Sequence, residues 1–148
     1  MVDRRVLDTL IELSERRRDE AANEAADARR ATEQVLATKQ QLQQYRADYD
    51  ARSPLRPGQQ TGPQQIERHQ RFVARLDVAI DDQARRHALM RRVQAQREAD
   101  LVERQKRLKA FETLKQRRDQ AYAQRQERHE QRLTDEQAAR IHQRRTRS

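Results

Sequence analysis

Residues 53–63 read Ser-Pro-Leu-Arg-Pro-Gly-Gln-Gln-Thr-Gly-Pro, and this short stretch holds every proline and glycine of the 148-residue chain. Proline and glycine are the strongest breakers of helices, so no strong breaker remains on either side of the stretch. The flanking segments are rich in Ala, Arg, Gln, Glu and Leu, which form helices readily. β-Branched residues are few and never alternate as a strand requires. The sequence therefore predicts helix, loop, helix.

The expected boundaries follow from residues that start or stop helices. Asp3 suits the N-cap of the first helix, and Pro54 disfavours a helical residue before it. Pro63 suits the first turn of the second helix, and Thr61 begins a capping-box pattern. We expect one hairpin over residues 1–148, with helices over about 3–52 and 63–142, a loop over about 53–62, and a frayed end over 143–148.

The composition argues against a compact enzyme domain. Leu, Ile, Val and Phe make up 25 of the 148 residues, charged residues make up 39%, and the formal net charge is +9. Such a chain is either disordered or built from long helices that meet along a narrow seam. Cysteine is absent, which excludes disulfides and thiol chemistry. Without a secretory signal or an apolar run of about 18 residues, we expect a soluble intracellular protein.

Hydrophobic periodicity favours the seam over disorder. Steps of seven residues from Leu7 to Tyr49, and again from Ile66 to Tyr122, pass mainly through apolar or amphipathic positions. A 3.5-residue repeat is typical of left-handed coiled coils. A loop of about ten residues lets the second helix return antiparallel to the first. The predicted fold is an all-α antiparallel two-helix coiled-coil hairpin, with a C-terminal helical overhang on the longer second helix.

Apolar residues gather at both ends of this hairpin. At the loop end, Tyr45 is expected opposite Phe72, with Tyr49 nearby, and these aromatics can serve as core or as a partner contact. At the other end, Ile11 and Leu13 cannot both face the same seam as Leu7 and Leu10, because successive residues rotate by about 100°. An apolar face wider than a seam indicates a further partner, although local overpacking is an equal alternative.

Four stretches carry a resemblance to a known family. Residues 7–13 read Leu-Asp-Thr-Leu-Ile-Glu-Leu, residues 106–114 read Lys-Arg-Leu-Lys-Ala-Phe-Glu-Thr-Leu, Leu42-x-x-Tyr45-x-x-x-Tyr49 precedes the loop, and Phe72-x-x-x-Leu76-x-x-Ala79-Ile80 follows it. In their joint spacing they resemble the flagellar type III export protein family FliJ over nearly the whole chain. The stalk proteins of virulence injectisomes are similar, but less closely.

The resemblance implies a non-enzymatic stalk in flagellar biogenesis, type III protein export and motility. The implied partners are the hexameric export ATPase ring, which it would enter and stimulate, and the cytoplasmic domain of the export-gate membrane protein. Export chaperones and the ATPase regulator are further implied partners. The implied location is cytoplasmic, peripheral at the inner face of the cell membrane, with no direct membrane insertion.

The family pattern also implies two contact surfaces. The export-gate contact, called the tip patch here, comprises Leu42, Tyr45, Tyr49, Phe72, Leu76 and Ala79. The ATPase-ring contact, called the base patch, comprises Leu7, Leu10, Ile11, Leu13, Leu108, Phe111 and Leu114.

Catalytic, metal and cofactor sites are not expected. The chain has no glycine-rich phosphate loop, and a two-helix hairpin offers no pocket that excludes water around a pair such as Asp81-Asp82. His69, His87, His129 and His142 lack metal-ligand spacing, so we expect four solvated histidines.

Charge leaves other functions open. Residues 1–51 hold 9 basic and 11 acidic side chains, a net −2, whereas residues 52–148 hold 24 and 13, a net +11. A basic coiled coil that binds nucleic acid is therefore one alternative, and a passive scaffold is another. Acidic residues are interleaved throughout and stacking aromatics are scarce, so nucleic-acid binding is the less favoured reading.

Overall fold

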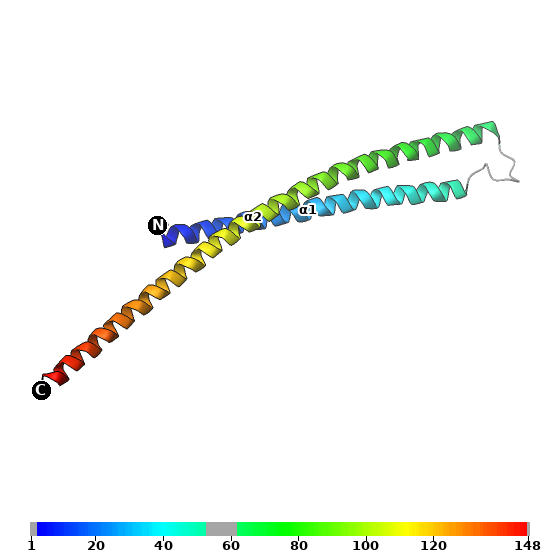
Figure 1. Cartoon of the computed structure of the whole chain (residues 1–148). Helices are drawn as coiled ribbons and strands as arrows, with labels where there is room; N and C mark the ends of the chain where they lie inside the picture. The colour runs from blue at the N-terminus through cyan, green and yellow to red at the C-terminus, as the bar shows by residue number, and fades with distance from the viewer. Residues whose placement is uncertain (1–2, 53–61, 148) are drawn as a thin grey trace. The chain divides into compact units, whose positions relative to one another are not determined.

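The computed structural model describes residues 3–52 and 62–147, and the described residues form two helices and no strand. Helix α1 spans Arg4–Ala51 and helix α2 spans Pro63–Thr146. The two helices pack against each other in antiparallel fashion, which confirms the predicted all-α helical hairpin (Figure 1). The chain divides into two compact units, one of residues 1–17 and 104–148 and the other of residues 18–103.

Each helix begins at a residue whose backbone carbonyl accepts the first helical hydrogen bond. The Asp3 carbonyl accepts a hydrogen bond from the Leu7 amide at 3.0 Å, which begins α1. The Gly62 carbonyl accepts from the amides of Gln65 and Ile66 at 3.1 and 3.3 Å, which begins α2. Proline at the first position of α2 costs no hydrogen bond, because that amide would have no helical partner. Thr61, and with it the capping box, lies outside the described residues.

The C-terminal end of α2 differs from the expected one. The helix continues to Thr146 instead of ending near residue 142. Arg144 and Arg145 lie in its last turn, where positive charge is stabilised by the helix dipole. The Thr146 hydroxyl lies 3.1 Å from the carbonyl oxygen of His142 and 3.0 Å from that of Gln143, so its single proton can be donated back to the last turn.

The unit of residues 18–103 is held by a narrow seam between α1 and α2. Its buried side chains are mostly small, namely Ala21, Ala25, Thr32, His69 and Leu76. Small residues bring the helices close but remove little apolar area from water, so this unit gains little from the hydrophobic effect per turn.

Among the described residues, arginines form ion pairs across this seam at two places. Arg97 Nη1 lies 3.3 Å from Glu24 Oε2, and Arg46 pairs with Asp77. Together with the contact between Tyr45 and Phe72, these pairs place opposite residues within about one turn of the register expected from the loop position.

The unit of residues 1–17 and 104–148 has its core at the start of α1. Leu7 is 2% exposed and Leu108 is 4% exposed, which makes them the two most buried apolar side chains of the described residues. From residue 121 to residue 147 every side chain is exposed, as expected for an overhang without a partner helix.

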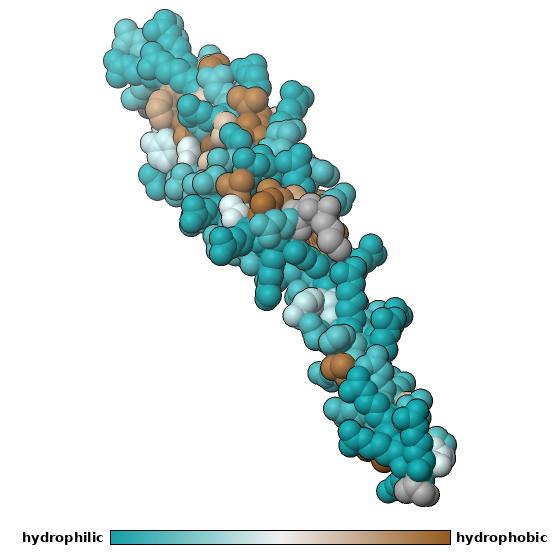
Figure 2. All heavy atoms as spheres, turned by 90° about the vertical axis from the view of Figure 1, so that its left-hand side faces the viewer, coloured by the Kyte–Doolittle hydropathy of each residue, from teal (hydrophilic) through white to brown (hydrophobic). Residues whose placement is uncertain are grey.

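The surface is mostly hydrophilic, and the hydrophobic residues on the face seen in Figure 2 form small separate patches. Neither described helix has a stretch apolar and long enough to cross a membrane.

Candidate partner-binding surfaces

The structure brings the aromatic rings of the tip patch into contact. The ring centroids of Tyr45 and Phe72 lie 6.0 Å apart at 75°, an edge-to-face arrangement. The rings of Tyr49 and Phe72 lie 4.5 Å apart and tilted. Aromatic pairs at these distances attract one another beyond the gain from burial alone. The three rings therefore fasten α1 to α2 near the loop, as a core function requires.

Exposure separates the members of the tip patch. Leu76 is buried at 8% exposure, whereas Tyr45 is 53% exposed although its edge contacts Phe72. The other four members are half-buried: Leu42, Tyr49, Phe72 and Ala79. Leu76 thus belongs to the seam, while about half of Tyr45 stays exposed.

His69 is the residue whose environment the sequence misjudged. It was expected to be solvated, but it is 6% exposed and its ring stacks on Tyr49 at 4.8 Å and 10°. Its Nε2 lies 3.8 Å from Asp50 Oδ1. Position 69 lies seven residues before Leu76, in the same row of the repeat. The position could therefore have indicated burial, although the residue type did not.

Truncating His69 should cost stability. We expect His69→Ala to lower the free energy of unfolding by about 2 kcal/mol, because it removes a buried ring stacked on Tyr49. Urea unfolding of the full chain, followed by circular dichroism, measures the change. His129→Ala is the matched control, since His129 is exposed on the same helix and should change stability by less than about 0.5 kcal/mol. Equal effects of the two substitutions would contradict the packing role of His69.

Arg46 links the two helices beside the aromatic rings. Its Nε and Nη2 donate to the two carboxylate oxygens of Asp77 on α2, while its Nη1 donates to Asp50 Oδ2 on α1 at 2.8 Å. The hydrogen bonds and charge of Asp77, with a smaller effect from Asp50, raise the pKa of the guanidinium above its usual value. The stability that this shift provides is present below the ordinary arginine pKa and is lost only as the pH rises through the folded value. The arginine side of this bridge is therefore insensitive to physiological pH.

The base patch contains buried and exposed members on both helices. Leu7 and Leu108 are buried, and Leu10, Ile11 and Phe111 are half-buried. Leu13 is 41% exposed and Leu114 is 46% exposed. The apolar face is thus wider than the seam, as the helical rotation predicted, and the two outer leucines are partly exposed to solvent.

An ion pair lies beside the buried leucines of the base patch. Lys115 Nζ lies 3.2 Å from Asp8 Oδ1, an oxygen that is shielded from solvent and accepts no hydrogen bond of proper geometry from a described residue. Lys115 therefore supplies the compensating charge for this carboxylate. The pair joins the first turns of α1 to α2.

At both surfaces the described residues lack a cluster of metal ligands. Among residues 3–52 and 62–147, no group of three or more His, Asp or Glu side chains is arranged to hold a metal ion. Both surfaces instead combine half-buried apolar side chains with exposed ones, as contact surfaces for other proteins do.

The comparison with known families agrees with this picture. Residues 4–147 match the family described as flagellar FliJ protein. No curated protein and no solved structure matches the chain. The matched family is a non-enzymatic component of flagellar protein export and associates with the export apparatus. Since the match covers nearly the whole chain, the protein belongs to the flagellar FliJ family and has a role in flagellar export.

Proposed function

We propose that this chain is the stalk that couples the flagellar export ATPase to the export gate. In this proposal the base patch enters the hexameric ATPase ring and stimulates it, and the tip patch contacts the cytoplasmic domain of the gate protein. The protein then works in the cytoplasm, at the inner face of the membrane, and also escorts export chaperones. Its family membership over residues 4–147 is the observation that carries the proposal.

The base patch supports the ring contact through its open leucines. Leu13 and Leu114 contribute little to the seam at 41% and 46% exposure, so they remain available to a ring of subunits. A stalk that contacts the subunits of a ring unequally stabilises some subunit states over others. Such unequal contacts can raise the rate of ATP hydrolysis without a catalytic group on the stalk.

The tip patch supports the gate contact through Tyr45. Tyrosine is among the residues most often found at the energetic centre of interfaces, and this ring is half exposed and held in place by its contact with Phe72. A ring fixed before binding loses less conformational entropy when a partner covers it.

The deciding experiment is the ATPase activity of the purified ring with and without this chain. We expect stimulation by the wild type and a loss of most of it with Leu13→Ala combined with Leu114→Ala. Leu89→Ala is the control, because Leu89 is 54% exposed and lies in neither patch. If the wild type neither stimulates the ring nor migrates with it, the stalk function is wrong.

A further inference from the structure

Three adjoining hollows at the base have apolar floors and basic rims. The first is lined by Leu10 and Leu13 of α1 with Phe111 of α2, the second by Phe111 and Leu114, and the third by Leu114 and Tyr122. Neighbouring hollows share Phe111 or Leu114, and the three are treated together as one surface, called the basic groove here. The first and third hollows include residues of both helices, whereas the second is lined by α2 alone. Its hollows measure about 250, 570 and 450 Å³.

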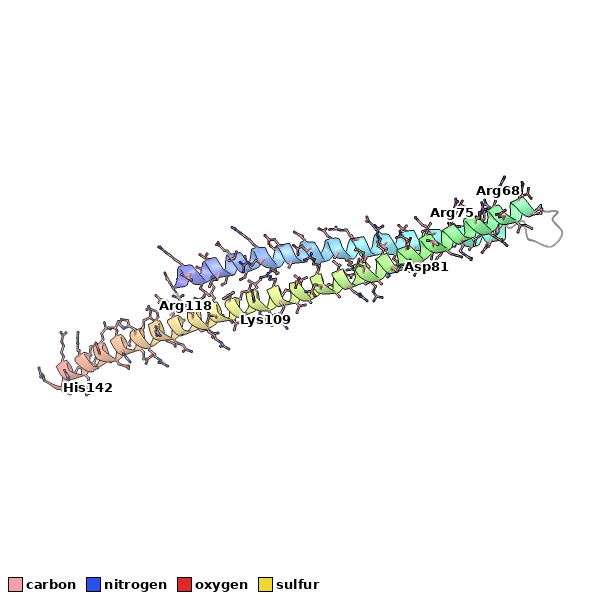
Figure 3. All side chains as sticks on the ribbon, turned by 90° about the horizontal axis from the view of Figure 1, so that it is seen from above. Arg68, Arg75, Asp81, Lys109, Arg118 and His142 are labelled. Carbon is pink, nitrogen blue, oxygen red and sulfur yellow. The ribbon has the colours of Figure 1, made fainter. Side chains whose placement is uncertain are left out.

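The rim of the basic groove carries one sign of charge. Six of its cations are Arg17, Arg104, Arg107, Lys109, Arg117 and Arg125. No aspartate or glutamate lines any of the three hollows. Figure 3 labels Lys109 and Arg118, two of the rim residues along this part of α2.

The six cations are also uncompensated within the part of the chain that the structure describes. None of them takes part in an ion pair there, although Lys115 close by is paired with Asp8. A further hollow at this end, lined by Ile11, has Glu15, Glu112 and Asp119 beside Lys115, so its lining carries more negative than positive charge. The excess of positive charge is therefore a property of the basic groove and not of the whole base.

We propose that the basic groove binds an acidic amphipathic helix of a partner protein, which packs as a third helix on α1 and α2. Floor residues from both helices match the way a helix docks its apolar face into the groove between two others. The groove extends along α2 from Arg104 to Arg125, a rise of about 32 Å, which corresponds to a ligand helix of about six turns. Carboxylates flanking the apolar face of that helix would meet the six cations.

The apolar floor of the groove favours an acidic protein helix over other anionic partners. Nucleic acid would pair its phosphates with the rim but would leave the exposed leucines Leu13 and Leu114 uncovered. A flat bilayer surface does not reach a floor that lies below long arginine side chains. An acidic amphipathic helix can insert aliphatic side chains between the cations. It then covers the apolar floor and pairs its carboxylates with the rim.

This inference deepens the proposed function, because it rests on the base being a partner-binding end and specifies the chemistry of that partner. The test of this inference uses no ATPase, so the inference and the proposed stalk function can fail independently. The probe is a synthetic amphipathic peptide of about 21 residues, with leucine along one face and glutamate on both flanks of that face. Its matched controls carry lysine or glutamine in place of every glutamate.

Titration calorimetry with the full chain measures the affinity for each peptide. We expect the glutamate peptide to bind at least about 10-fold more tightly than the lysine peptide. We expect a groove variant, Arg17→Glu with Arg107→Glu and Arg117→Glu, to weaken that binding by at least about 10-fold. The control variant carries Arg68→Glu, Arg75→Glu and Arg86→Glu, an equal charge change on exposed sites outside the groove, and should bind within about 3-fold of the wild type.

Circular dichroism checks that each variant keeps its helicity. If the groove variant loses helicity, the same three positions are changed to glutamine, and the same loss of binding is expected. Equal binding of the glutamate and lysine peptides, or unchanged binding by the groove variant, would overturn the proposal. So would binding of anionic vesicles or duplex DNA that depends on the three groove arginines when the glutamate peptide does not bind.

Discussion

Leu7→Ala is expected to lower the free energy of unfolding by about 3 kcal/mol, the largest loss for any single truncation in the seam. Leu7 is 2% exposed and belongs to the same core as Leu108. Among the described residues of the unit 1–17 and 104–148, these two are the buried apolar side chains. Losing its side chain leaves a cavity and removes apolar contacts that hold α1 against α2. The first turns of α1 should then leave α2, and the base patch should lose its shape.

Amide hydrogen exchange measures this result directly. Protection of the amides over residues 7–17 should fall in the Leu7→Ala variant, while protection within residues 18–103 should change much less, because that unit has its own seam. Val6→Ala is the neighbouring control, since Val6 is 50% exposed and its loss should cost less than about 0.5 kcal/mol. Equal protection in the wild type and the Leu7→Ala variant would show that the base does not depend on this leucine.

Tyr45→Ala is expected to weaken binding to the cytoplasmic domain of the gate protein by about 30-fold, which corresponds to about 2 kcal/mol at an interface centre. The same substitution should cost less than about 1 kcal/mol of stability, because the ring is 53% exposed and contacts Phe72 only by its edge. A large effect on binding with a small effect on folding is the signature of a contact residue.

Two further variants are compared with Tyr45→Ala. Leu89→Ala removes an apolar side chain with 54% exposure outside the tip patch and should leave gate affinity within about 2-fold. Phe72→Ala removes a half-buried ring that touches both tyrosines, so it should lower stability more than Tyr45→Ala does. If Tyr45→Ala reduces helicity as much as Phe72→Ala, the aromatic cluster is core and not a gate contact.

The fold could be predicted because its decisive signals are local. Every proline and glycine lies in residues 54–63, and the seven-residue repeat needs only helix geometry to be read as a seam. The pairing of Tyr45 with Phe72 followed from the position of the loop. The helical end at Thr146 was missed because periodicity says nothing about a segment without apolar residues, whereas side-chain hydrogen bonds and the helix dipole act there.

The candidate surfaces could be predicted only in part. Their apolar members follow from periodicity and the family pattern, but the division between buried Leu76 and exposed Tyr45 depends on how two helices rotate against each other. His69 was misjudged because histidine is usually solvated on a helix, and only its stacking on Tyr49 reveals a packing role. The basic groove is lined by Arg17 as well as by Arg107 and Arg117. These residues are far apart in the sequence, so the sequence alone did not reveal that they belong to one surface.

The small residues in the seam of residues 18–103 have a consequence for how the two helices keep their alignment. Alanine at positions 21 and 25 fits against α2 almost equally well if one helix slides past the other, because its small side chain does not select one partner position by shape. The alignment is then fixed mainly by the ion pairs of Arg46 with Asp77 and of Arg97 with Glu24. The aromatic rings near the loop add to them. Salt screens exposed charges, so rising ionic strength should loosen the longitudinal alignment of this unit before it melts the helices.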